Sequence, residues 1–258
     1  MAKFNRNTSG GCFHDGRAIM RMVDEFWGEY WPVGNVVQVE IHELLESCTT
    51  MSGPDSMLDE VHVFDAHGAL AESVFYDDDV PYLMRKNEYD SADCIAKRTS
   101  TDVETGESTM WLYTADPANH KVIALVHSTQ LQKTALSDIY MVDIDGRIST
   151  CDFNVGSTER GDRWLVRRNG MGHIDATIVQ DEPGTDSIIW RNECNAQGVP
   201  VKIGQFTPEG ILKSERTLSY VYDINGNWTE EKKVIIDYGR DGPSRETVTK
   251  RKRIITYR

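Results

Sequence analysis

Histidine, cysteine and acidic residues in the first fifty positions suggest metal ligands, but their spacing fits no established site. His42-Glu43 begins like the helical zinc-protease motif, and Glu46 stands where that motif requires a second histidine. The segment also alternates like a strand, which sends successive side chains to opposite faces. A zinc cluster could instead draw on four scattered residues, Cys12, His14, His42 and Cys48, in a spacing unlike standard zinc sites. We predict no metal site and no cofactor.

Other chemistry-bearing motifs are equally incomplete. Asp77–Asp79 offers three adjacent acids without the alternating ligands and glycine turn of a calcium loop, so we predict a solvated turn. Arg160-Gly-Asp162 matches an integrin-binding tripeptide that occurs often by chance. The chain has no glycine-rich phosphate loop, Gly-x-Ser-x-Gly elbow or Cys–His nucleophile pattern. A glycosidase-type carboxylate pair stays open among the 41 acidic residues, but we predict that the protein is not an enzyme.

Four tryptophans are the candidate binding residues. A row of aromatic side chains on one sheet face can stack against a sugar ring or a peptide. All four occupy strand-like segments: Trp111, Trp164, Trp190 and Trp228. The alternative role is structural, because repeated aromatic residues commonly hold neighbouring repeats together.

A short phrase repeated seven times sets the elements that would position these residues. Each copy has Asp or Asn, two further residues and then Gly, Asn or Asp, the preference of a type I β-turn. The fourth positions fall at 68, 93, 119, 146, 172, 198 and 226, in steps of 25, 26, 27, 26, 26 and 28 residues. A fixed period in this range indicates a repeat architecture. The predicted turn residues are Asp65, Gly68, Asp90, Asp143, Gly146, Asn195, Gly198, Asp223 and Gly226.

Strand-like segments flank each predicted turn. Val, Ile, Tyr, Trp and Phe dominate segments such as Val122–Val126 and Ser219–Tyr222. We therefore predict a mostly β fold, an antiparallel β-meander of about seven hairpin repeats in a sheet that curls or forms layers. Trp111, Trp164 and Trp190 each stand eight positions before the fourth residue of a turn, which predicts that they share one face.

The N-terminal residues follow another pattern. Apolar residues at 19, 22, 23, 26, 27 and 30 predict one short amphipathic helix, which Pro32 ends, and Val36–Leu45 then alternates like a strand. We predict two parts: residues 1–57, a helix–strand segment that packs on the sheet, and residues 58–258, the β-hairpin repeat domain. A partner-binding helix is the alternative for the first part.

Charge and composition restrict the classes of partner and the cellular compartment that we expect. The formal net charge of −13 argues against general binding to nucleic acid, which needs clustered cations. No run of 18 apolar residues is present, so we expect no membrane insertion. Five scattered cysteines and no signal-peptide pattern predict a cytoplasmic protein, or a secreted or periplasmic one if a leader was removed. The basic run Lys250–Arg253 in the last predicted strand suggests a guard on a sheet edge.

Two copies of the turn phrase resemble a known repeat. Tyr222-Asp-Ile-Asn-Gly-Asn-Trp-Thr229 and Tyr89-Asp-Ser-Ala-Asp-Cys-Ile95 resemble the YD repeat of Rhs-type proteins, Tyr-Asp-x-x-Gly followed by an apolar residue. The resemblance covers about residues 58–258 and extends to MORN-like β-hairpin repeat proteins of bacteria. It implies a hairpin array used for binding, encapsulation or surface display. Only two of the seven copies contain Tyr-Asp, and the period is longer than that of a usual YD repeat.

Together these features predict a non-enzymatic binding or scaffold protein. Its contact surface would be a sheet face or an exposed edge, and its partner another protein. One alternative is an immunity or antitoxin-like protein whose acidic surface neutralises a basic partner. The other is a carbohydrate-binding module or carbohydrate-active enzyme that uses the tryptophans beside paired acids.

Overall fold

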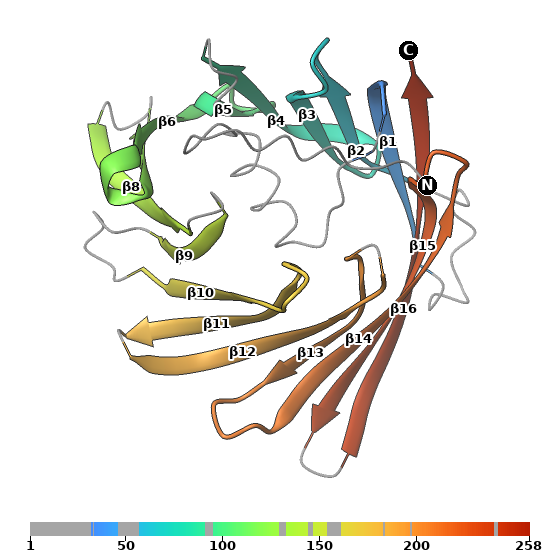
Figure 1. The fold of residues 1–258 in the computed structure, drawn as a ribbon. Coiled ribbons are helices and arrows are strands. Elements are labelled where there is room, and N and C mark those ends of the chain that lie inside the picture. The colour runs from blue at the N-terminus through green and yellow to red at the C-terminus, as the bar shows by residue number, and fades with distance from the viewer. Residues whose placement is uncertain are drawn as a thin grey trace.

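The protein is a closed β-barrel of sixteen strands (Figure 1). A computed structural model describes residues 32, 34–45, 57–90, 95–128, 133–143, 147–153, 161–182, 184–196, 198–239 and 242–258. Each strand pairs antiparallel with its neighbours in chain order, and β1 (Val36–Leu45) also pairs with β16 (Gly242–Tyr257). The described residues contain one 3-10 turn, η1 (Pro117–Asn119), and no α-helix. None of their helical structure is long and apolar enough to cross a membrane.

The strands between β1 and β16 follow the chain around the ring. Their bounds are β2 (Met57–Phe64), β3 (Leu70–Asp77), β4 (Val80–Tyr89), β5 (Ile95–Asp102), β6 (Ser108–Asp116), β7 (Lys121–Ser128), β8 (Lys133–Val142), β9 (Ile148–Asp152), β10 (Arg163–Arg168), β11 (Ile174–Glu182), β12 (Thr185–Cys194), β13 (Pro200–Phe206), β14 (Leu212–Tyr222) and β15 (Trp228–Gly239).

The closed ring corrects the predicted β-meander of about seven hairpins. Strands β2 to β15 do form successive hairpins, but β1 and β16 join the two ends of that array, with register pairs from Val36↔Tyr257 to Leu45↔Thr249. Pairing of both edges satisfies backbone groups that an open sheet leaves free. The predicted N-terminal helix lies outside the described residues. Strand β1, from the predicted segment 1–57, is part of the same barrel as the rest.

The barrel has a buried inner wall and a charged outer wall. Direct cross-strand partners share a face and successive residues alternate, so the register assigns each side chain to one wall. An apolar cluster lines the inner wall on β7–β9, consisting of Val122, Ala124, Tyr140, Val142, Ile148 and Cys151. A second lies where β1 meets β2 and β3, consisting of Val36, Val39, Ile41, Phe64 and Leu70. Burial of these residues provides the main apolar stabilisation of the wall.

The described residues of the turn phrases lie at one rim of the barrel. Each connects an even-numbered strand to the next odd-numbered one, so antiparallel order places them at the same end. In the first copy Asp65 Oδ1 accepts hydrogen bonds from the backbone N–H groups of His67 and Ala69, each at 2.8 Å. Asp223 repeats this with Asn225 and Asn227 at 2.8 and 2.9 Å. Asp90 directly follows β4, which ends at Tyr89, and Gly146 lies outside the described residues.

Asn195 and Asp143 cap their turns in a similar way. Asn195 Oδ1 accepts from the N–H of Val199 at 3.0 Å, and Asp143 Oδ1 accepts from that of Arg147 at 2.8 Å. These side-chain acceptors satisfy turn N–H groups that have no strand partner, which is why Asp and Asn recur at this position.

Two of the turn glycines should respond differently to alanine. Gly226 and Gly198 have φ of +84° and +86°, where a side chain strains the backbone. A Cβ on Gly226 meets nothing within 4 Å, whereas one on Gly198 meets the His173 ring at 2.7 Å. We expect Gly226→Ala to lower the free energy of unfolding by about 1–2 kcal/mol. Gly198→Ala should cost about 1 kcal/mol more because the imidazole must move.

Urea unfolding monitored by far-ultraviolet circular dichroism would measure both losses. The double variant Gly198→Ala with His173→Ala is the control, since it removes the clash and keeps the strain. Equal losses for the two single variants would contradict this account of Gly198.

Candidate functional site

The basic run at the end of the chain is divided between the two walls. Lys250 and Lys252 face outward and are exposed, while Arg251 and Arg253 face inward. Strand β16 pairs with β15 on one side and β1 on the other. The predicted edge guard is therefore wrong, because this strand is not an edge. The run instead supplies cations to a groove outside and to an ion network inside.

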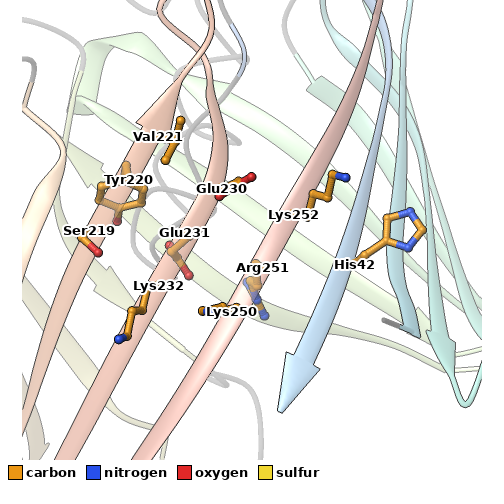
Figure 2. Close-up of a pocket in the computed structure, with 10 residues that line it drawn as sticks. All are labelled: His42, Ser219, Tyr220, Val221, Glu230, Glu231, Lys232, Lys250, Arg251 and Lys252. Carbon is orange, nitrogen blue, oxygen red and sulfur yellow. The ribbon is translucent and has the colours of Figure 1, made fainter. Parts of the chain in front are cut away.

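The groove lies on the outer wall over β14, β15, β16 and β1 (Figure 2). Its volume is about 390 Å³, within the range of small-ligand sites. The lining residues are His42, Ser219, Tyr220, Val221, Glu230, Glu231, Lys232, Lys250, Arg251 and Lys252. The lining contains three runs of three consecutive residues, at 219–221, 230–232 and 250–252. In each run the first and third side chains face outward, and the middle side chain faces the inner wall.

Cations dominate the outward side chains of the groove. Lys232 is the direct cross-strand partner of Lys250, and like charges in that position destabilise a sheet. Lys252 stands opposite Glu230 on one side and His42 on the other. Of these outward cations within the described chain, neither Lys232 nor Lys252 forms an ion pair, while Lys250 has an interaction of its own. The arrangement concentrates positive charge in a strongly acidic protein.

His42 lies at the border of the groove on β1. Its Nε2 lies 3.5 Å from Glu40 Oε2 on the same face of β1. Glu43, the next residue, faces the inner wall opposite Arg251. The two residues of the zinc-protease-like motif therefore point to opposite sides of the sheet and cannot share one metal ion.

Behind the groove an ion network lies on the inner wall. The Arg251 guanidinium is 3.4 Å from Asp59 Oδ2 and 3.8 Å from Glu43 Oε2. Burial raises the pKa of Asp59, and nearby Glu60 raises it further, against the lowering effect of Arg251. Burial opposes the charge of Arg251, but the surrounding carboxylates keep its pKa raised overall. Lys233, also on this wall, has its pKa lowered by burial and by Arg251.

Trp228 packs in the inner wall beside this network. The Arg253 guanidinium carbon lies 3.5 Å from the centroid of the Trp228 ring, and only 3% of Trp228 is exposed. Tyr220 lies 6.1 Å from the same ring between centroids. Burial, together with the charge of Glu231, raises the pKa of Tyr220. The outer groove therefore lies directly over a cluster of aromatic and charged side chains on the inner wall.

The other three tryptophans also face the inner wall. The register chain through β6–β12 places Trp111, Trp164 and Trp190 on the same face. Trp164 makes an edge-to-face contact with Phe153 at 5.4 Å, and the Arg216 guanidinium lies 5.0 Å from the Trp190 ring. None of the four lines the groove. Their shared face is thus the inside of the barrel.

A Glu–His–Ser chain on β2 and β3 resembles a nucleophilic triad. His62 Nδ1 lies 2.8 Å from Ser73 Oγ, and His62 Nε2 lies 2.9 Å from Glu60 Oε2. Ser73 is only 3% exposed, and the three are simply neighbours on one face. We interpret them as a polar network that satisfies buried groups. Burial likewise raises the pKa of the Cys151 thiol to about 12, which keeps it protonated.

The metal candidates are not brought together. Among the described residues, no three His, Cys, Asp or Glu side chains converge as a metal site would require. Asp79 Oδ1 accepts a hydrogen bond from the Leu58 N–H at 2.7 Å, and Asp78 and Asp79 form the β3–β4 turn with positive φ. Cys12, His14, Glu46, Cys48 and Arg160 lie outside the described residues.

Comparisons with known proteins give distant structural likenesses. No family model matches the chain, and no curated protein matches it. A porin-like protein from Bacteroides uniformis is similar at 10% identity and a TM-score of 0.44, over 89% of this chain and all of that one. A putative outer membrane lipoprotein-sorting protein domain from Vibrio parahaemolyticus is similar at 9% identity and a TM-score of 0.26, over 93% and 92% of the two chains.

The closed barrel corrects the predicted YD-repeat-like meander of about seven hairpins in a curled or layered sheet. The described strands form one closed barrel of sixteen, whereas the resemblance implied an array of β-hairpin repeats over about residues 58–258. The Tyr-Asp dipeptides at 89 and 222 stand at strand ends next to rim turns. Their local role is that of turn formers.

Proposed function

We propose that this is a non-enzymatic binding protein that holds an acidic partner protein against the outer groove of β14–β16 and β1. The observation that carries the proposal is the placement of Lys232 directly opposite Lys250 in a concave surface. Lys232 and Lys252 add outward cations on either side of Lys250, and the acidic surface of a partner would complement their charge. The sign of the groove favours an acidic partner over the basic one expected for an antitoxin.

The rest of the outer wall supports a surface in contact with water. Cross-strand ion pairs cover it, including Lys86–Glu72 at 3.4 Å and Lys202–Glu215 at 2.8 Å. Charged side chains on the lipid face of a membrane barrel cost about 2–4 kcal/mol each near the bilayer midplane. An outer wall that carries such ion pairs favours contact with water, where a partner protein can reach the groove.

Neutralising the groove should abolish capture of the partner. In a pull-down from native lysate, we expect the triple variant Lys232→Gln, Lys250→Gln, Lys252→Gln to retain at least about tenfold less of the proteins bound by wild type, since charge pairs contribute both affinity and steering. The retained proteins should be acidic, and raising the salt concentration should release them.

The matched control is Lys86→Gln with Lys97→Gln. Both lysines are on the outer wall and paired with Glu72 and Glu88, away from the groove. This control removes two positive charges and should leave capture unchanged. Equal capture by the triple variant and wild type would refute the proposed function.

A further inference from the structure

We infer that the inner wall of β14–β16 binds a small amphipathic oxyanion, a molecule with a negatively charged oxygen-bearing group on an apolar body. The site is separate from the outer groove, because its side chains face the opposite side of the same strands. It adds a small-molecule ligand to the proposed function. Two cations, a buried hydroxyl and the apolar side chains beside them define the site.

The two cations are neighbours on the inner wall and have no anion between them. Arg216 on β14 pairs with Ile235 on β15, and Lys233 lies two residues before Ile235 on the same wall. Diagonal neighbours of this kind are within reach of long side chains. Within the described part of the chain, neither cation forms a hydrogen bond or an ion pair. A cation that loses water without gaining a partner costs free energy, so a ligand anion would be bound favourably there.

Burial of both cations supports this inference. Burial lowers the pKa of Arg216 more than nearby Asp237 raises it. Burial and the charge of Arg251 lower the pKa of Lys233 more than the nearby carboxylates raise it. The carboxylates of the inner wall therefore do not compensate these two charges. Both side chains keep part of their surface exposed, so a ligand can reach them.

A buried hydroxyl completes the polar part of the site. Thr249 on β16 is the direct cross-strand partner of Lys233, so its side chain lies on the same wall. Only 6% of Thr249 is exposed, and its Oγ1 has no hydrogen-bond partner among the described residues. The Nε of Arg216 is buried and lacks a partner in the same way. Buried polar atoms are rarely left unsatisfied, so both donors are available to the oxygen atoms of a ligand.

Apolar side chains beside the cations provide the contact for an apolar body. Leu218 lies on the same wall and is 8% exposed. Ile203 and Ile235 flank Arg216 on the strands to either side. The Arg216 guanidinium carbon lies 5.0 Å from the centroid of the Trp190 ring. Guanidinium and ammonium donors accept carboxylates and phosphoryl groups alike, so the cations select oxyanions as a class and the apolar surface selects those with an apolar body.

A short fatty acid tests the inference with the intact protein. By isothermal titration calorimetry at low ionic strength, we expect octanoate to bind with a dissociation constant on the order of 100 μM. Octanol, which has the chain without the charge, should bind at least about tenfold more weakly. Acetate, which has the charge without the chain, should also bind at least about tenfold more weakly. Binding of octanol or acetate as tight as that of octanoate would overturn the inference.

Variants on the two walls locate the site. Lys233→Met with Arg216→Met removes both inner cations and keeps much of their volume, so it should weaken octanoate binding by at least about tenfold. The matched control is Lys202→Met with Arg191→Met on the outer wall of β12 and β13. Arg191 also lies over an aromatic ring, 4.8 Å from its centroid, and the control should bind octanoate as wild type does. Unchanged binding by the inner variant would contradict the assignment of the site.

The stability of the free protein provides an independent measurement. Lys233→Met should raise the urea midpoint, because it removes a partly buried cation that has no ion pair in the described chain. Octanoate should raise the midpoint of wild type and leave that of Lys233→Met with Arg216→Met unchanged. A lower midpoint for Lys233→Met without ligand would show that the free protein already compensates this charge, and would overturn the inference.

Discussion

Arg251→Met is expected to lower the free energy of unfolding by about 3 kcal/mol at pH 7, because it leaves buried carboxylates without their cation. Arg251 lies 3.4 Å from Asp59 and 3.8 Å from Glu43, and Glu60 and Glu231 also interact with its charge. Methionine keeps much of the side-chain volume, so the loss reports charge more than packing. Urea unfolding at a series of pH values would measure it.

The loss should grow as the pH rises from about 4 towards 7. The folded pKa of Asp59 is already raised by burial, so its ionisation lowers native stability as the pH rises through that pKa. Arg251 lowers the same pKa, so its removal raises the pKa further and increases the penalty. Arg245→Met, at an exposed position on the same strand, is the control and should change stability by no more than about 0.5 kcal/mol. A loss that does not vary with pH would contradict the electrostatic explanation.

Trp228→Ala is expected to lower the free energy of unfolding by about 3–5 kcal/mol. The ring is 3% exposed and fills the inner wall between Tyr220 and the Arg253 guanidinium. Alanine would leave a cavity at the start of β15 and would remove the aromatic face that covers a buried cation. Chemical unfolding monitored by circular dichroism would measure the change.

Two further variants separate the ring from the cation above it. Trp228→Phe keeps an aromatic face and removes an indole N–H that donates to no described residue, so its cost should stay below about 1.5 kcal/mol. A double-mutant cycle with Arg253→Met should give a coupling energy of about 1–2 kcal/mol. Ile254→Ala, on the outer wall and 46% exposed, should cost about 0.5 kcal/mol. If Trp228→Ala cost no more than this control, the tryptophan would not support the wall.

Local structure could be read from the sequence because it depends on neighbouring residues. The turn phrase marks one connection in each hairpin, as Asp65 and Asp223 illustrate through their bonds to turn N–H groups. The equal offset of Trp111, Trp164 and Trp190 from their turns likewise predicts a shared face. Both arguments need only local geometry and a side-chain period of two.

Closure of the barrel and formation of the groove depend on pairing between strands, which the local sequence pattern does not specify. Nothing in the turn spacing says that Val39 will pair with Ile255, since the strands that join the ring come from opposite ends of the chain. The groove requires the register of β15 against β16, which places Lys232 beside Lys250. Alternation within Lys250–Arg253 was a usable signal, because a strand sends lysines and arginines of that run to different sides.

The junction of β1 and β16 has a consequence for assembly of the chain. Fifteen of the pairings join strands that are consecutive in the chain, but the junction of β1 and β16 must wait for a segment more than 200 positions away, as the Leu45–Thr249 pair shows. Distant pairings of this kind slow folding. Until this pairing forms, the sheet has two edge strands whose backbone N–H and C=O groups are unpaired and can pair with another chain. A chain truncated before β16 would therefore keep exposed edge strands, and its copies would tend to associate by pairing those edges.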